Sequence, residues 1–168
     1  LSKAQREFRL YLPLYNGVDR VEIGIPKGAE IKAVPASTGK PVVIYGSSII
    51  QGFGASRAGM NVGSILGRRL NREVINLGFS GLCKMEPELA DLLAELDPAL
   101  FVIDCLPNMT AEEITQRTVS FVKKIRSVRP NTPILMVEHP NYAHTSWDVE
   151  ARESIKEKNA AFLQQFNR

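Results

Sequence analysis

The sequence predicts an α/β fold in which helices cover both faces of a parallel sheet. Three observations carry this prediction. Short apolar runs rich in β-branched residues recur from residue 42 onward, a turn follows each run, and a stretch with helical periodicity separates most runs from the next. Such alternation of strand and helix is typical of parallel sheets. The length of 168 residues, with 44% hydrophobic and 23% charged residues, suits one globular domain with a sizeable core.

The first 36 residues follow a different pattern. Apolar and polar residues roughly alternate in 8–12 and 21–25, and a third, less regular run covers 31–34. Period-two runs bounded by proline and glycine predict strands of a half-buried antiparallel sheet. Residues 37–41, which combine serine, threonine, glycine and proline, are expected to form a linker.

From residue 42 the elements follow in regular order. We expect strands near 42–46, 73–77, 100–104 and 133–138, and helices at 60–71, 85–95, 111–128 and 149–166. The carboxyl ends of parallel strands meet at one edge of a sheet, which is where open α/β folds bind their ligands. The turns after the first three strands are therefore expected to lie close together.

The turn after the first strand is the most informative segment. The run Val42–Ile44 is followed by Tyr45 and then by Gly46-Ser47-Ser48, which places the Ser48 hydroxyl at the carboxyl edge of the sheet. An elbow of the G-x-S-x-G type would need glycine at position 50, which is isoleucine. A dinucleotide loop would need glycine at position 57, and a phosphate loop would need it at 34, where the chain has Arg57 and Val34. Ser48 is thus either a candidate nucleophile or the N-cap of the next helix.

Two further turns carry small or amide-bearing residues. The segment Asn76–Gly81 begins at the end of the second strand, and Asp104–Met109 begins at the end of the third. Taken alone, Gly81 fits a plain turn glycine, and Asn108 fits a helix cap or an Asx turn.

Together these segments resemble the GDSL or SGNH hydrolases, and more narrowly the bacterial GDSL-like acylhydrolases that carry a small β domain before the catalytic one. The resemblance runs from about residue 8 to the end of the chain, and its motifs are 46–52, 55–60, 76–81 and 104–108. It implies the SGNH hydrolase fold, a three-layer α/β/α arrangement with a flavodoxin-like parallel sheet. It also implies that residues 1–36 are the tail of the β domain, and that residues 41–168 are a hydrolase-like domain that is incomplete at its C-terminus.

The resemblance also implies roles for particular residues. Ser48 would be the nucleophile, and the backbone N–H groups of Ser48 and Gly81 would form an oxyanion hole together with the side-chain amide of Asn108. Ser47 stands where the motif that names the family has aspartate. Arg57, in the loop beside this site, would contact a substrate anion or a sugar hydroxyl, or be a solvated or structural arginine.

The base that would activate Ser48 is missing from the chain. The family places an Asp-x-x-His pair near its C-terminus, whereas the two histidines here, His139 and His144, have Met136 and Asn141 three residues before them. We interpret both as loop histidines without a catalytic part. The chain is therefore expected to be a fragment whose base lies outside it, and to be weakly active or inactive by itself.

The predicted function is that of a serine esterase that cleaves small acyl esters, and the resemblance suggests acetyl groups on carbohydrate. The alternative is a non-catalytic binding domain that keeps the hydrolase cleft without a complete triad. No cofactor is expected, and the absence of CxxC and HxxxH spacing argues against a metal site. Cys83 and Cys105 each follow a strand and could be neighbours, although free thiols are the simpler expectation.

The bulk properties exclude other partners. A net charge of +3 with only isolated basic pairs argues against nucleic acid, and no apolar run is long enough to span a membrane. The expected partner is a small-molecule or carbohydrate ester. The sequence leaves the oligomeric state and the compartment open, with a periplasmic or secreted bacterial protein as one option.

Overall fold

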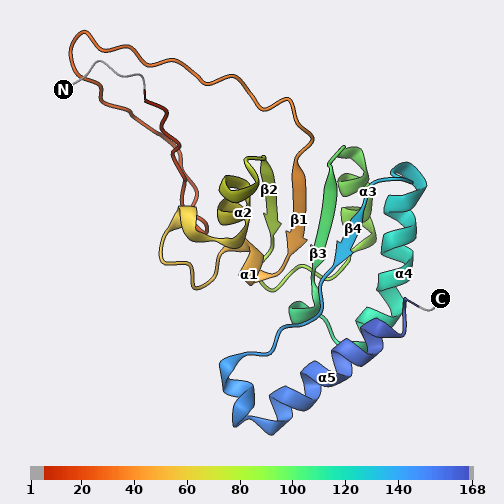
Figure 1. The fold of residues 1–168 in the computed structure, drawn as a ribbon. Coiled ribbons are helices and arrows are strands. Elements are labelled where there is room, and N and C mark those ends of the chain that lie inside the picture. Colours follow the sequence, from red (N-terminus) through yellow and green to blue (C-terminus); the bar gives the residue numbers. More distant parts are fainter. Residues whose placement is uncertain (1–5, 167–168) are drawn as a thin grey trace.

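The computed structural model describes residues 6–166, and its centre is a sheet of four parallel strands (Figure 1). The order in the sheet is β2-β1-β3-β4, which is the order of flavodoxin-like folds. The predicted α/β fold with a flavodoxin-like sheet is therefore confirmed. The strands are β1 (Val42–Gly46), β2 (Val74–Gly78), β3 (Leu100–Asp104) and β4 (Ile134–Met136).

The strand register makes the three turns of interest start at one level. Gly46 at the end of β1 pairs with Gly78 of β2 on one side and with Asp104 of β3 on the other. Because all three strands run in the same direction, the residues that follow them leave the sheet at the same edge.

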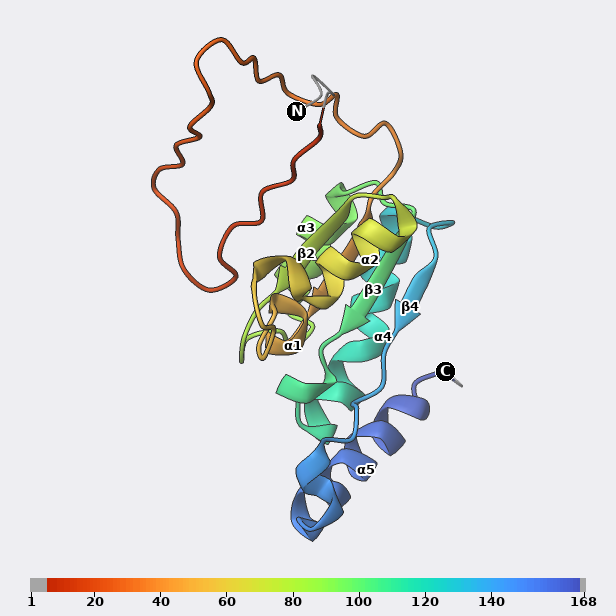
Figure 2. The same cartoon turned by 60° about the vertical axis from the view of Figure 1, so that its left-hand side comes forward.

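Helices cover both faces of the sheet (Figure 2). Ile50 of α1 and Leu66 of α2 pack with Val42 and Ile44 on one face, while side chains of α3 and α4 pack on the other face around Tyr45 and Phe101. The alternation of side chains along β1 thus serves two cores at once. The helices are α1 (Ser48–Gln51), α2 (Val62–Leu70), α3 (Pro87–Glu95), α4 (Ala111–Val128) and α5 (Val149–Leu163), and single 3₁₀ turns cover Ala58–Met60, Leu106–Asn108 and Ala143–Ser146.

The last helix, α5, lies beyond the carboxyl ends of the strands and packs against α4 (Figure 1). Phe162 of α5 is buried in the larger core cluster, and Asn159 holds the segment after β4 through two hydrogen bonds to the backbone of His139. No helix of the described residues is both long enough and apolar enough to cross a membrane.

The strands predicted within residues 8–36 are not formed, because residues 6–40 contain no strand. Figure 2 shows this segment looping away from the body of the molecule. Side chains on which the alternation rested, such as Val21, Ile23 and Ile31, are exposed. A strand is stabilised by a neighbour with which it pairs, and the described residues offer none to this segment. The division of the chain into 1–36 and 41–168 stays a prediction, and its residues 1–5 and 167–168 lie outside the described residues.

The expectation of free thiols is wrong, because Cys83 and Cys105 form a disulfide. The loop after β2 crosses the end of β1 and so meets the end of β3, where the two Cα atoms are 5.3 Å apart. This separation is within the range that a disulfide spans. Both cysteines are fully buried in the larger core cluster.

Candidate functional site

Hydrogen bonds between backbone atoms hold the three turns together at the carboxyl edge of the sheet. The Phe79 N–H donates to the carbonyl of Gly46 over 2.8 Å, and the Ser47 N–H donates to the carbonyl of Asp104 over 3.0 Å. The turn after β1 is therefore bonded to both of its neighbours. The expectation that the turns meet at one edge is confirmed for these residues.

Ser48 is the first residue of α1, directly after the strand. Ser47, not Ser48, caps this helix: its buried side chain accepts a hydrogen bond from the Ile49 N–H over 3.4 Å. The alternative that Ser48 is an N-cap is thus excluded, and its hydroxyl is not engaged in capping. Ser48 itself is half-buried, and its carbonyl accepts hydrogen bonds from the N–H groups of Gly52 and Phe53 over 3.0 and 2.8 Å.

Glycine at position 78 allows α1 to lie directly against the end of β2. A Cβ atom at Gly78 would stand 2.1 Å from the backbone nitrogen of Gln51, which no side chain can accommodate. Asn76 reinforces this contact, because its Nδ2 donates to the carbonyl of Ile50 over 2.6 Å and its Oδ1 accepts from the Gly78 N–H over 2.9 Å.

Gln51 connects α1 with the loop that contains Gly81. Its Oε1 accepts from the Ser80 N–H over 2.9 Å, next to the residue predicted to supply an oxyanion donor. Sequence reasoning quoted Asn76 and Gln51 within its motifs but gave them no role. The feature that could have revealed them is a side-chain amide at the end of a strand or helix, because an amide can donate to one neighbouring backbone and accept from another.

Gly81 lies in an exposed turn after β2 with a φ of +75°, in the left-handed region that favours glycine. No atom would lie within 4 Å of a Cβ at this position, so the surroundings of Gly81 are open. The conformation explains why a glycine stands here, and the open space leaves room for a ligand.

Asn108 ends the 3₁₀ turn after β3 and is half-buried. Its Nδ2 donates to the carbonyl of Phe79 over 3.3 Å, so the third turn is bonded to the second. Thr110, not Asn108, caps α4, in a capping box completed by Glu113. The helix-cap alternative for Asn108 is therefore excluded, and the contact with Phe79 orients its amide toward the turn that contains Gly81.

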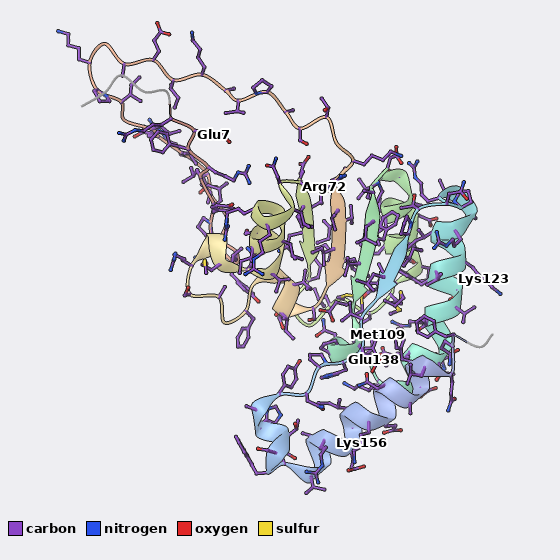
Figure 3. All side chains as sticks on the ribbon, viewed as in Figure 1. Glu7, Arg72, Met109, Lys123, Glu138 and Lys156 are labelled. Atoms are coloured by element: carbon purple, nitrogen blue, oxygen red, sulfur yellow. A yellow bond between two sulfur atoms is a disulfide. The ribbon has the colours of Figure 1, made fainter. Side chains whose placement is uncertain are left out.

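The disulfide adds a covalent link between the second and third turns. Cys83 follows Gly81 by two residues, and Cys105 precedes Asn108 by three. Figure 3 shows the side chains at this end of the sheet, with Met109 and Glu138 between the strands and α5. The two candidate oxyanion donors outside α1 are thus carried by segments that are crosslinked in the core.

The two histidines lie in the segment after β4. His139 is buried, and its Nδ1 lies 2.8 Å from the carbonyl of Pro140, an acceptor that requires the proton on Nδ1. Burial lowers the pKa of His139 below its usual value. His144 is exposed and stacks on Tyr142. Within residues 6–166 no hydrogen bond joins the Ser48 side chain to either histidine. That neither histidine takes part in catalysis stays a prediction.

Asp104 is a buried carboxyl group at the end of β3, 7% exposed. Burial raises its pKa to about 6, and its Oδ1 has no hydrogen-bond partner among the described residues. Burial raises the pKa of Tyr142 in the segment after β4, and the charge of Asp104 adds to this increase. The sequence alone does not reveal this buried group, because the burial of a strand's last residue depends on what packs over the sheet edge.

A parallel sheet of this order with polar turns at its carboxyl edge is the architecture of the SGNH hydrolases. The chain belongs to the GDSL-like lipase/acylhydrolase family, whose model matches residues 39–168. A second model, described as the N-terminus of Esterase_SGNH_hydro-type, matches residues 1–31. A comparison with curated proteins finds no match.

Solved structures support the same assignment. A putative GDSL-like lipase from Bacteroides ovatus ATCC 8483 is 41% identical with a TM-score of 0.90, and the match covers 94% of this chain and 47% of that one. The chain thus spans about half the length of this relative. Two more distant structures share the fold. The salicylyl-acyltransferase SsfX3 from a tetracycline biosynthetic pathway is 18% identical with a TM-score of 0.67, and the match covers 77% of this chain and 39% of that one. The SGNH-hydrolase family esterase AlinE4 is 16% identical with a TM-score of 0.57, and the match covers 77% of this chain and 72% of that one.

Proposed function

We propose that this chain carries the nucleophile and the oxyanion hole of a serine esterase that cleaves small acyl esters, with acetyl groups on carbohydrate as the expected substrates. Ser48 attacks the ester carbonyl, and the carbonyl oxygen gains negative charge as the tetrahedral intermediate forms. The alcohol then leaves with a proton, and water releases the acyl group from Ser48. A histidine and an acid that lie outside this chain would move the protons.

The observation that carries this proposal is that hydrogen bonds hold the turns after β1, β2 and β3 together beside Ser48. The Ser48 hydroxyl is free of capping, and Asn108 and the loop of Gly81 are bonded to each other through the carbonyl of Phe79. Donors that are fixed before the reaction stabilise an oxyanion without reorganising, which is why removal of one such donor raises the barrier by about 3 kcal/mol. Family membership supports an acylhydrolase reaction, and the preference for acetylated carbohydrate rests on the resemblance alone.

Hydrolysis of an aryl acetate tests the proposal. We would measure kcat/KM for this chain and for the longest natural protein that contains it, with Ser48→Ala and Ser56→Ala as a matched pair of variants. The proposal predicts that Ser48→Ala abolishes turnover and that Ser56→Ala, in the exposed loop beyond α1, keeps it. Equal turnover by both variants would show that another group performs the reaction.

The second candidate is a binding domain that keeps the cleft without turnover. It is favoured by the fact that no hydrogen bond joins the Ser48 side chain to a base within residues 6–166. Turnover that depends on Ser48 in either protein rejects this candidate. Binding of an ester without turnover in the longest natural protein supports it.

A further inference from the structure

The segment before the linker contacts the helix that carries the candidate nucleophile. The hydroxyl of Tyr15 donates to the carbonyl of Ser48 over 3.3 Å, and the side-chain amide of Gln51 donates to the carbonyl of Leu14 over 3.3 Å. Residues 13–16, which we term the strap, therefore bond to α1 at both its first and its last residue. These bonds join two parts of the chain that the sequence assigns to different domains.

The C-terminal end of α1 is shaped to receive the strap. Gly52, which caps the helix with a φ of +123°, lies against the Leu14 side chain, and a Cβ atom at this glycine would stand 2.4 Å from Cδ1 of Leu14. Leu14 is half-buried, whereas its neighbours Pro13 and Tyr15 are exposed. The absence of a side chain at position 52 thus lets Leu14 close over the end of the helix.

A second contact holds the chain just before the strap against α2. The ring of Tyr11 lies 5.4 Å from the guanidinium carbon of Arg68, and a Cβ atom at Gly59 would stand 2.9 Å from the same ring. The Nη1 of Arg68 donates to the hydroxyl of Tyr11 over 3.0 Å and to the carbonyl of Gly59 over 2.6 Å. The strap is therefore fixed to the body of the protein on its N-terminal side as well as at α1.

A helix as short as α1 depends on such contacts for its orientation. It has four residues, about one turn, and isolated helices of this length do not persist in water. On the side of the sheet, α1 is held by the buried side chain of Ile50 and by its close approach to Gly78. The strap adds contacts at the two ends of the helix. Because Ser48 is the first residue of α1, the direction of its hydroxyl follows the orientation of this helix.

We infer that the strap is a positioning element of the esterase site, which holds α1 in the orientation that directs the Ser48 hydroxyl toward the ester carbonyl. Leu14 and Tyr15 are its positioning residues, and they act through α1 without touching the reacting atoms. Displacement of a reacting group by about 1 Å can lower a rate about 10²-fold, so contacts outside the reacting atoms can have a large effect on kcat. The role in catalysis rests on the proposed function, whereas the seating of α1 by the strap can be measured without turnover.

Turnover of an aryl acetate by the longest natural protein that contains this chain tests the catalytic role. Tyr15→Phe removes only the hydroxyl that bonds to α1, and Leu14→Ala removes the side chain that lies over Gly52. We expect kcat to fall about threefold or more in each variant and about tenfold or more in the double variant, while KM changes less than about twofold. The matched controls are Tyr11→Phe, which removes a hydroxyl bonded to α2, and Leu10→Ala, at an exposed position before the strap. Both should keep kcat within about twofold of the parent.

Amide hydrogen exchange in this chain tests the seating of α1 without turnover. The N–H groups of Gly52 and Phe53 both donate to the carbonyl of Ser48, so their exchange reports the opening of α1. The two strap variants should raise the exchange rates of these amides about threefold or more, and the two control variants should leave them unchanged.

Unchanged exchange at these amides in both strap variants would overturn the inference, because the strap would then not hold α1. An unchanged kcat in the double variant would overturn it as well, and a rise in KM alone would assign the strap to substrate binding instead. Faster exchange without any Ser48-dependent turnover in the parent would keep the seating of α1 and reject the esterase. Ser48-dependent turnover that the strap variants leave unaffected would keep the esterase and reject the positioning role.

Discussion

Reduction of the disulfide between Cys83 and Cys105 should destabilise the fold by an amount that follows from the chain it closes. The two residues are separated by 22 positions. In the loop-entropy model, opening a loop of this length increases the entropy of the unfolded chain and lowers the free energy of unfolding by about 3 kcal/mol. For a protein of this size, that loss corresponds to a decrease in melting temperature of roughly 6–12 °C.

The assay is a thermal melt with and without a phosphine reductant, with the oxidation state of each sample established by intact mass. The double variant Cys83→Ala/Cys105→Ala is the control, and its melting temperature should not respond to the reductant. An oxidised protein that melts at the same temperature before and after full reduction would refute the reasoning. Free thiols in a protein purified without reductant would contradict the disulfide itself.

Three further predictions concern the edge of the sheet. Because burial raises the pKa of Asp104 from 3.8 to about 6, the stability that its protonation provides is fully present below about pH 4 and is lost as the pH rises through 6. In urea unfolding, the free energy of unfolding of Asp104→Asn should therefore rise by about 2–3 kcal/mol relative to that of the parent between pH 4 and pH 8. Parallel plots of this free energy against pH for the two proteins would contradict the prediction. Gly78→Ala should destabilise by about 3 kcal/mol or more, because its Cβ meets backbone, whereas Gly24→Ala in open space should change stability by less than about 1 kcal/mol; similar values would show that the close approach is not rigid. Asn108→Ala should lower kcat by about 10²–10³-fold in an active protein, and an unchanged kcat would remove it from the oxyanion hole.

The fold from residue 42 onward could be predicted because local pattern and tertiary structure agree there. The apolar run of β1 is buried throughout, and the glycine and serines that end it form the turn that the sequence indicates. The N-terminal segment shows where this agreement ends. Its alternating residues, such as Val21 and Ile23, match a strand locally, but a strand requires a pairing neighbour, and periodicity cannot say whether one is present.

The candidate site was predictable in its position and less so in its supports. Parallel strands bring Ser48, Gly81 and Asn108 to one edge, which follows from topology alone. The disulfide and the buried charge of Asp104 depend on how loops cross the edge, and sequence spacing does not determine those paths. The roles of Gln51 and Tyr15 were missed for the same reason, since each bonds to a segment that is remote in sequence.

The most direct test of the account is the intact mass of the protein before and after treatment with a fluorophosphonate. The account predicts an adduct that maps to Ser48 once the protein includes the base that activates it, and no adduct in Ser48→Ala. An adduct in this chain alone would mean that a base is already present and would return His139 and His144 to consideration. Absence of any adduct at Ser48 in the longest natural protein that contains the chain would contradict the claim that Ser48 is a nucleophile.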